Sequence, residues 1–158
     1  MRGGQLISTA ELTQKILNEV ACHPGTEGVT FLGGEPFDQP GELAELASNL
    51  RSSGLSIMVF TGFTLEELQA SKNSANAAFL DEIDLLVDGK FEQSNLDSSR
   101  PWLGSSNQRF HFLTSRYNTL DVQSRDYLEV TVKSNGELQI NGWATPSDLE
   151  QVLDILQG

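Results

Sequence analysis

The chain has 158 residues, of which 38% are hydrophobic and 20% charged, as expected of one globular domain. Its net charge of −12 repels phosphate backbones and anionic lipids, which argues against nucleic acid and membrane surfaces as partners. The sequence shows neither an apolar run of about 18 residues nor an apolar N-terminal segment, so we expect a cytoplasmic protein.

The sequence contains one cysteine, Cys22, and two histidines, His23 and His111. One cysteine cannot form an internal disulfide. An iron–sulfur cluster usually needs three or four thiolates, and a zinc site needs three or four ligands. We therefore expect no complete metal site within these residues.

The first part of the chain alternates helices with short apolar strands. Ser8 to Glu11 form a capping-box pattern before a helix that ends at Pro24-Gly25. Strands are predicted at residues 28–32, 55–60 and 83–87. Helices begin near Pro40 and Thr64, and residues 73–77 are predicted to form a polar loop. Their regular spacing predicts parallel βαβ units with right-handed crossovers, and hence an α/β fold.

The pattern changes after residue 90. Residues 92–108 are polar and loop-like, and residues 109–114 are a candidate fourth strand. Two alternating segments, 127–133 and 137–142, flank an Asn-Gly turn and predict a hairpin. A capped helix is predicted from Thr145 onwards. We see no linker, so residues 1–158 are expected to form one domain.

Polar residues follow each predicted parallel strand at its carboxyl end, where open sheets and barrels bind ligands. Glycine there allows close approach of a ligand, and Glu35, Thr61 and Asp88 supply polar groups. Simpler interpretations stay open for all of them. The Gly33-Gly34 pair is also typical of a turn, Asp88-Gly89 of a tight hairpin into residues 90–91, and Thr61-Gly62 of a helix cap.

Other polar residues favour structural roles. His23 and Cys22 lie at a predicted helix end, where packing or capping is the commoner role. His111 alternates with two phenylalanines and is predicted to face outward from its strand. Three arginines around Trp102 fit either a phosphate or base site or, more commonly, a solvated loop; they are Arg100, Arg109 and Arg116.

Five segments together resemble one family. TFLGGEPF at residues 30–37 resembles the GGEP motif of radical S-adenosylmethionine (SAM) enzymes. FTGFTLEEL (60–68), VDGKFEQ (87–93) and LGSSNQRFHFL (103–113) are similar to segments of anaerobic ribonucleotide reductase activating proteins. EVTVKSNGELQINGW (129–143) resembles the C-terminal hairpin of related single-cluster proteins. GGEP alone is a weak signal, whereas the ordered set is specific.

The resemblance implies a partial (β/α) barrel of the radical SAM type with a C-terminal hairpin and helix. It implies SAM and a [4Fe–4S] cluster as cofactors, a glycyl-radical enzyme such as the large subunit of anaerobic ribonucleotide reductase as partner, and an electron donor such as flavodoxin. No catalytic residue or metal ligand is predicted in this chain. By resemblance, the cofactor-binding candidates are Gly33, Gly34, Glu35, Pro36, Thr61, Gly62, Asp88 and Asn107.

The sequence departs from the family at its cysteines. The resemblance implies a CxxxCxxC loop upstream of a segment like residues 3–9, and Cys22 is not part of such a loop. We expect a start assigned too late, with an upstream segment that supplies the cysteines and a first strand; a true loss of the cluster is the alternative. A cluster-free module that binds SAM or docks on a reductase, and a generic nucleotide-binding domain with a chance GGEP, are competing functions.

Overall fold

The structure is a computed structural model that describes residues 6–97, 99–122, 129–132 and 138–141. It divides between Thr119 and Leu120 into two units, which are described separately. Whether the whole chain acts as one domain stays a prediction.

The first unit is built on a four-stranded sheet in the order β1-β2-β3-β4. β1 to β3 are parallel, and β4 runs antiparallel to β3. This mixed α/β arrangement confirms the predicted parallel strands and the predicted fourth strand. The bounds are Gly28–Phe31 for β1, Ser56–Phe60 for β2, Leu85–Asp88 for β3 and Arg109–Phe112 for β4.

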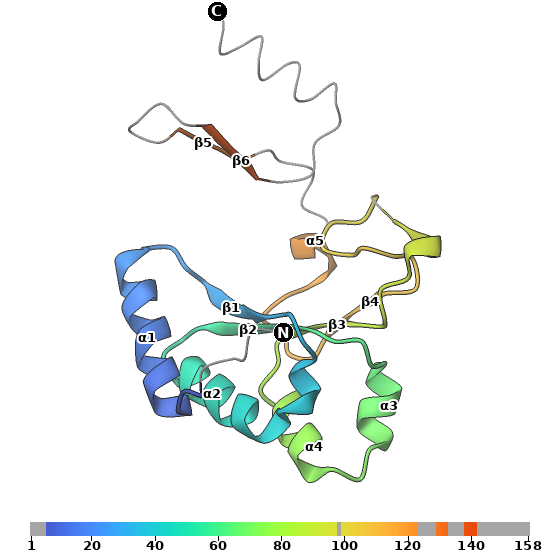
Figure 1. Ribbon diagram of the computed structural model, residues 1–158, viewed down its shortest axis with the longest axis horizontal. Coiled ribbons are helices and arrows are strands. Elements are labelled where there is room, and N and C mark those ends of the chain that lie inside the picture. The colour runs from blue at the N-terminus through green and yellow to red at the C-terminus, as the bar shows by residue number, and fades with distance from the viewer. Residues whose placement is uncertain (1–5, 98, 123–128, 133–137, 142–158) are drawn as a thin grey trace, which may run out of the picture. The chain divides into compact units, whose positions relative to one another are not determined.

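Helices cover one face of this sheet (Figure 1). Buried Ile57, Val59 and Leu86 from the strands share one core with Leu50 of α2 and Phe79 of α4. Burial of each large apolar side chain contributes roughly 1.5–3 kcal/mol, so this layer positions the strands. The helix bounds are Thr9–Cys22 for α1, Pro40–Ser52 for α2, Leu65–Ala70 for α3 and Ser74–Leu80 for α4.

The predicted helix caps are present at α1 and α3. The Ser8 side chain accepts a hydrogen bond from the Glu11 backbone N–H at 3.2 Å. Thr64 and Glu67 form a reciprocal capping box at the start of α3. These bonds fix where each helix begins relative to the strand or segment before it.

The prediction of a polar loop at residues 73–77 is wrong. Asn73 is the N-cap of α4, and its side chain accepts a hydrogen bond from the Ala75 backbone N–H at 3.0 Å. Asparagine favours both loops and caps, and the alanines that follow favour a helix. Burial of Phe79 against the core then stabilises this short helix.

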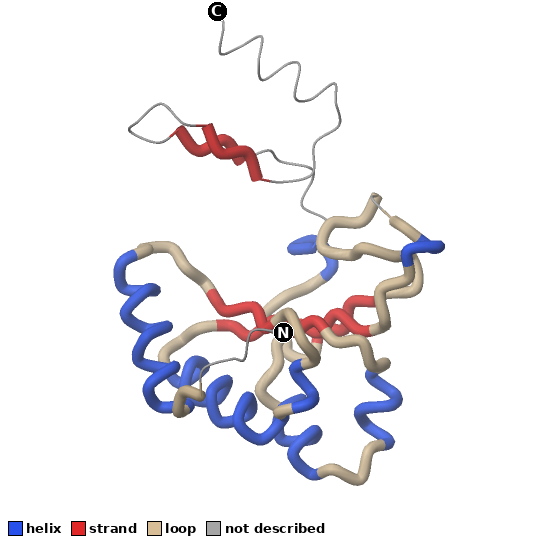
Figure 2. The backbone as a smooth tube through the Cα atoms, in the orientation of Figure 1, coloured by secondary structure: helices blue, strands red, loops and turns tan. Residues whose placement is uncertain are grey.

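The segment between β3 and β4 is almost entirely loop (Figure 2). It contains one 3-10 turn, η2 (Gln93–Asn95), and a single antiparallel bridge between Leu96 and Ser105. Another 3-10 turn, η1 (Pro36–Asp38), follows β1. The loop predicted at residues 92–108 is therefore confirmed, and η2 is the one helical turn among its described residues, 92–97 and 99–108.

The second unit contains the predicted hairpin. β5 (Glu129–Val132) pairs antiparallel with β6 (Leu138–Asn141), and Val130 lies opposite Ile140. The short α5 (Thr119–Val122) spans the boundary between the units. The predicted Asn-Gly turn and the helix predicted from Thr145 lie outside the described residues.

Two further features concern surfaces. Among the described residues, β1 pairs with β2 alone, so its outer edge has no strand partner, and Leu32 just beyond it is 68% exposed.

None of the helices in the described ranges has the length and apolar character needed to cross a bilayer.

Candidate ligand-binding rim

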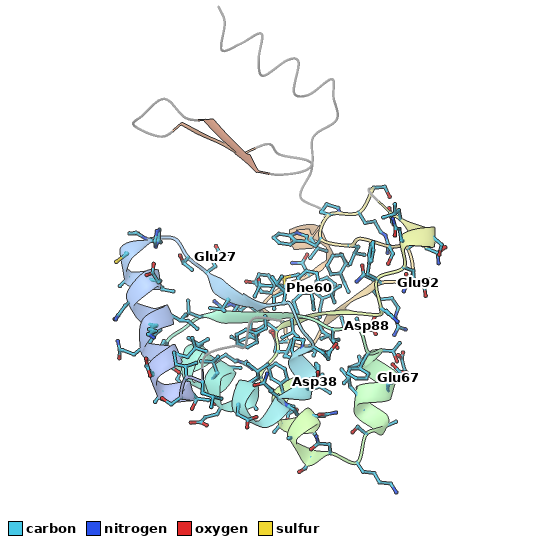
Figure 3. All side chains as sticks on the ribbon, viewed as in Figure 1. Glu27, Asp38, Phe60, Glu67, Asp88 and Glu92 are labelled. Atoms are coloured by element: carbon cyan, nitrogen blue, oxygen red, sulfur yellow. The ribbon has the colours of Figure 1, made fainter. Side chains whose placement is uncertain are left out.

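The carboxyl ends of β1, β2 and β3 lie at one edge of the sheet because the three strands are parallel. We call the residues that follow these ends the rim. Backbone hydrogen bonds join neighbouring parts of it, from Thr61 N–H to the Val87 carbonyl and from Gly89 N–H to the Phe63 carbonyl, each 3.0 Å. Figure 3 shows Asp88 at the end of β3 and Glu67 on the nearby α3.

The rim begins with two glycines after β1. Gly33 has φ of 85° and Gly34 has φ of 54°, backbone conformations that favour glycine. No heavy atom lies within 4 Å of a Cβ built on either residue, so both face open space. Pro36 and Phe37 are buried and start η1, which anchors the exposed glycine pair.

Glu35 connects the end of β1 to the end of β2. Its Oε1 accepts hydrogen bonds from the Thr61 hydroxyl at 2.8 Å and from the Phe37 backbone N–H at 3.0 Å. Its Oε2 accepts from the Gly62 backbone N–H at 2.9 Å. Thr61 is only 5% exposed, and its Oγ1 also accepts from the Phe63 N–H. One side chain thus holds both strand ends together.

Asp88 connects the end of β3 to β4 and α3, and its side chain is fully buried. Its carboxylate accepts hydrogen bonds from the Leu65 backbone N–H at 2.8 Å and from two nitrogens of Arg109. Burial raises the pKa of Asp88, but the hydrogen bonds from Arg109 and Leu65, together with the adjacent His111, outweigh this and hold the pKa below its usual value. The carboxylate is therefore charged and paired.

Arg109, the first residue of β4, completes this connection. Its other guanidinium bonds reach Glu66 at 3.0 and 2.6 Å, which ties the first turn of α3 to the sheet. The bonds to Glu66 and Asp88 raise the pKa of Arg109, and the bond from Arg109 lowers the pKa of Glu66. The arginine is thus held by protein carboxylates.

Asn107 and Gln108 attach the long loop to the rim. The Asn107 side chain donates to the Lys90 carbonyl at 2.7 Å. Gln108 donates to the Gly89 carbonyl at 3.2 Å and accepts from the backbone N–H of Gly104 at 2.9 Å. Sequence reasoning did not single out Gln108, because no local pattern signals a glutamine that connects two distant backbone segments.

The structure contradicts two of the interpretations made from the sequence. The tight hairpin at Asp88-Gly89 is wrong, because the antiparallel partner of β3 is β4 and not residues 90–91. The outward-facing prediction for His111 is also wrong. Its side chain is only 19% exposed, and Nε2 lies 2.9 Å from Asp88 Oδ2. Alternation within a strand could not reveal which face is covered; His111 lies opposite Leu86, a fully buried core residue.

The other predicted residues have structural partners. His23 is the C-cap of α1, as predicted, and Cys22 beside it is exposed. The Arg100 guanidinium bonds Asp97 and two loop carbonyls, and Arg116 bonds the carbonyls of residues 27 and 54. Like Arg109, these arginines are held by acceptors within the protein.

The sequence is similar to those of known proteins. The model of the 4Fe–4S single cluster domain family matches residues 1–111, so the chain belongs to that family. Its relatives include the anaerobic ribonucleoside-triphosphate reductase-activating protein of Escherichia coli (strain K12), which is 38% identical over 91 residues. The same-named protein of Salmonella typhimurium is 36% identical over 112 residues.

These matches are partial. The aligned part covers 55% of this chain and 56% of the Escherichia coli protein, so the chain spans just over half the length of that relative. For the Salmonella typhimurium protein the shares are 66% and 69%. No solved structure matches the chain.

The family implies an iron–sulfur cluster, and the described residues do not fit one. Within residues 6–97, 99–122, 129–132 and 138–141, no three Cys, His, Asp or Glu side chains are grouped so as to hold a metal ion. Cys22, the one cysteine of the sequence, is exposed at the end of α1. A [4Fe–4S] cluster usually needs three or four thiolates, which this one cysteine cannot supply.

Proposed function

We propose that this chain is the SAM-binding part of a radical SAM activase whose partner is the large subunit of an anaerobic ribonucleotide reductase. The observation that carries the proposal is the rim, where Glu35 accepts a hydrogen bond from the Thr61 hydroxyl at 2.8 Å and Asp88 ends the next strand. Family membership and the names of the relatives support the same function.

We propose a partial (β/α) barrel of the radical SAM type as the architecture of this domain. In barrels of this kind parallel strands carry helices on one face, and ligands bind at the carboxyl ends of the strands. The parallel β1, β2 and β3, with helices packed on one side, support this arrangement.

In this proposal the rim binds and orients SAM. Gly33 and Gly34 let the methionyl group approach the backbone, because both face open space. Thr61 and Gly62 form the side of the rim next to the glycine pair. Asp88 holds the end of β3 in position, and Asn107 holds the long loop. The candidates Glu35 and Pro36 complete the turn after β1.

The cluster ligands do not lie among the described residues, so the contribution of this chain is binding and orientation of SAM. Reductive cleavage of SAM would need the cluster-loaded activase. An electron donor such as flavodoxin would reduce it, and the protein would be cytoplasmic. The single cysteine favours a second candidate function, a cluster-free module that binds SAM or docks on the reductase.

Calorimetric titration of residues 1–158 with SAM and with ATP tests the proposal. We expect saturable SAM binding and no ATP binding, because a net charge of −12 disfavours a polyanion. Gly34→Ala should weaken SAM binding about tenfold, since φ of 54° strains a side chain and a Cβ enters the site. Gly54→Ala is the matched control, because Gly54 also has positive φ but lies before β2.

Three results would contradict the proposal: no SAM binding, equal binding of ATP, or equal effects of both glycine substitutions. A second arm addresses the partner. Sedimentation of the chain with the large subunit of an anaerobic ribonucleotide reductase should give a complex, and sedimentation as separate species would argue against that partner.

A further inference from the structure

The long loop between β3 and β4 exposes a group of large apolar side chains. Phe91, Leu96 and Trp102 are 53%, 67% and 53% exposed, and they are three of the seven large hydrophobic residues that are exposed in the described part of the chain. We call these three residues the loop patch. An exposed apolar patch on a soluble protein marks a surface that contacts another molecule, provided that its side chains lie together.

The three side chains belong to one surface because the loop folds back on itself. Leu96 is paired with Ser105 in an antiparallel bridge, and the Phe91 ring lies 3.0 Å from the position that a Cβ on Gly104 would take. Trp102 precedes Gly104 by two residues. Each member of the patch is therefore in contact with the segment 104–105 or within two residues of it.

Trp102 is held in a backbone conformation that a tryptophan rarely adopts. Its φ is 69°, and it is the one residue other than glycine with a positive φ in the part of the chain that the structure describes. For a bulky side chain this conformation is strained, and strain of this kind gathers at functional sites. Burial does not explain it, since about half of the side chain lies in solvent. The strain displays the indole ring to another molecule.

Hydrogen bonds fix the shape of the loop that carries the patch. The Arg100 guanidinium donates to the carbonyls of Ser105 and Gln108, each at 3.3 Å. The Gln108 side chain accepts from the Gly104 backbone N–H at 2.9 Å, and Leu103 beside Trp102 is only 1% exposed. A surface that is already ordered loses little conformational entropy when a partner binds.

The charge of the loop favours a protein partner other than a second copy. Residues 89–108 contain two basic and two acidic residues and so carry no net charge, whereas the whole chain carries −12. At this loop a partner can approach an otherwise acidic protein without meeting an excess of like charge. Two copies of the chain, each with a charge of −12, would repel each other.

The position of the loop favours a partner that must reach the rim. Gln108 donates to the Gly89 carbonyl at 3.2 Å, and Asn107 donates to the Lys90 carbonyl at 2.7 Å. These bonds attach the loop to the segment that follows β3, so a protein bound at the loop lies next to the rim. In the proposed function, that protein is the large subunit of the reductase.

We propose that the loop patch is the docking surface for this large subunit, and that the Trp102 side chain inserts into an apolar pocket of the partner. The inference rests on the proposed function and adds to it the surface and the chemistry of the contact. Tryptophan is enriched among the interface residues whose truncation weakens binding most, because its ring buries a large apolar area.

A sedimentation titration of residues 1–158 with the large subunit tests the inference through Trp102→Gly. Glycine adopts φ of 69° without strain, so this variant removes the side chain and keeps the loop conformation. Affinity for the large subunit should fall about thirtyfold, the loss typical of an interface anchor. Affinity for SAM should stay unchanged, because Trp102 does not follow a parallel strand.

Leu96→Asp is a second variant, which leaves the strained position intact. Leu96 is 67% exposed, so an aspartate there should fold normally, and its charge should weaken the complex about tenfold because an apolar pocket disfavours it. Leu6→Asp is the matched control. Leu6 is an exposed leucine that precedes α1, and its substitution should leave the complex unchanged.

Three results would overturn the inference. They are an unchanged affinity for the large subunit in either loop variant that circular dichroism shows to be folded, an equal loss in Leu6→Asp, and an equal loss of SAM affinity in Trp102→Gly. Dimerisation of the unsubstituted chain that both loop variants abolish would also overturn it, because a second copy would then occupy the patch. If the unsubstituted chain binds neither SAM nor the large subunit, the proposed function itself fails.

Discussion

The Thr61 hydroxyl donates a 2.8 Å hydrogen bond to the Glu35 carboxylate, so residues that follow two different strands are joined directly. The same carboxylate accepts the Gly62 backbone N–H at 2.9 Å. Because β1 and β2 are parallel and in register, these bonds set how far apart the two strand ends lie. They define the wall of the rim next to the open glycine pair.

Thr61→Val should reduce the free energy of unfolding by about 1 kcal/mol, since a nearly buried hydroxyl that donates to a carboxylate is lost. Thr61→Ser keeps the hydroxyl and should lose less. Urea denaturation of both variants measures the difference. Equal loss in the two variants would show that the methyl group, and not the hydrogen bond, stabilises this position.

Asp84→Asn should cost about 2 kcal/mol of stability. The Asp84 carboxylate is 2% exposed and accepts from the Ile57 backbone N–H at 2.9 Å and the Thr114 hydroxyl at 2.7 Å. An amide can satisfy only one of these donors without rearrangement. The exposed Asp81 provides the control, and Asp81→Asn should change stability by less than about 0.5 kcal/mol. Similar effects of both substitutions would contradict a structural role for Asp84.

Substitution of Arg109 should show that the low pKa of Asp88 depends on this arginine. Arg109→Met leaves a fully buried carboxylate without its two guanidinium bonds, so the pKa of Asp88 should rise. Because the variant carboxyl then takes up a proton at higher pH, acid unfolding should begin at a higher pH than in the unsubstituted chain. Arg100→Met, which removes an arginine of the long loop, should leave Asp88 unaffected. Circular dichroism against pH distinguishes the two, and coincident acid transitions would contradict the account.

Asp97 should contribute stability that disappears at low pH. Hydrogen bonds from the Ser99 side chain, Arg100 and the Ser99 backbone lower the pKa of Asp97 to about 2, below its usual value of 3.8. The unfolded chain therefore binds a proton first, and stability falls as the pH drops from about 4 to about 2. Asp97→Asn should flatten this part of the stability profile. An unchanged slope in the variant would rule out the pairing with Ser99 and Arg100.

Sequence patterns predicted the three parallel strands because each is a short apolar run that ends in glycine or a polar residue. They also predicted that Glu35, Thr61 and Asp88 would follow neighbouring strands. They could not predict the partners of Asp88, since Arg109 lies 21 residues away and reaches it only through β3–β4 pairing. The helix at α4 was missed because Asn73 suits both a loop and a cap.

The central claim is that the ends of β1, β2 and β3 form one SAM-binding rim, and amide chemical shifts during a SAM titration test it most directly. We predict saturable shifts at Gly33, Gly34 and Gly62, with none at Gly25 and Gly54, glycines of positive φ that precede β1 and β2. Shifts centred on Gly25 and Gly54, or no shifts at all at saturating SAM, would contradict the claim.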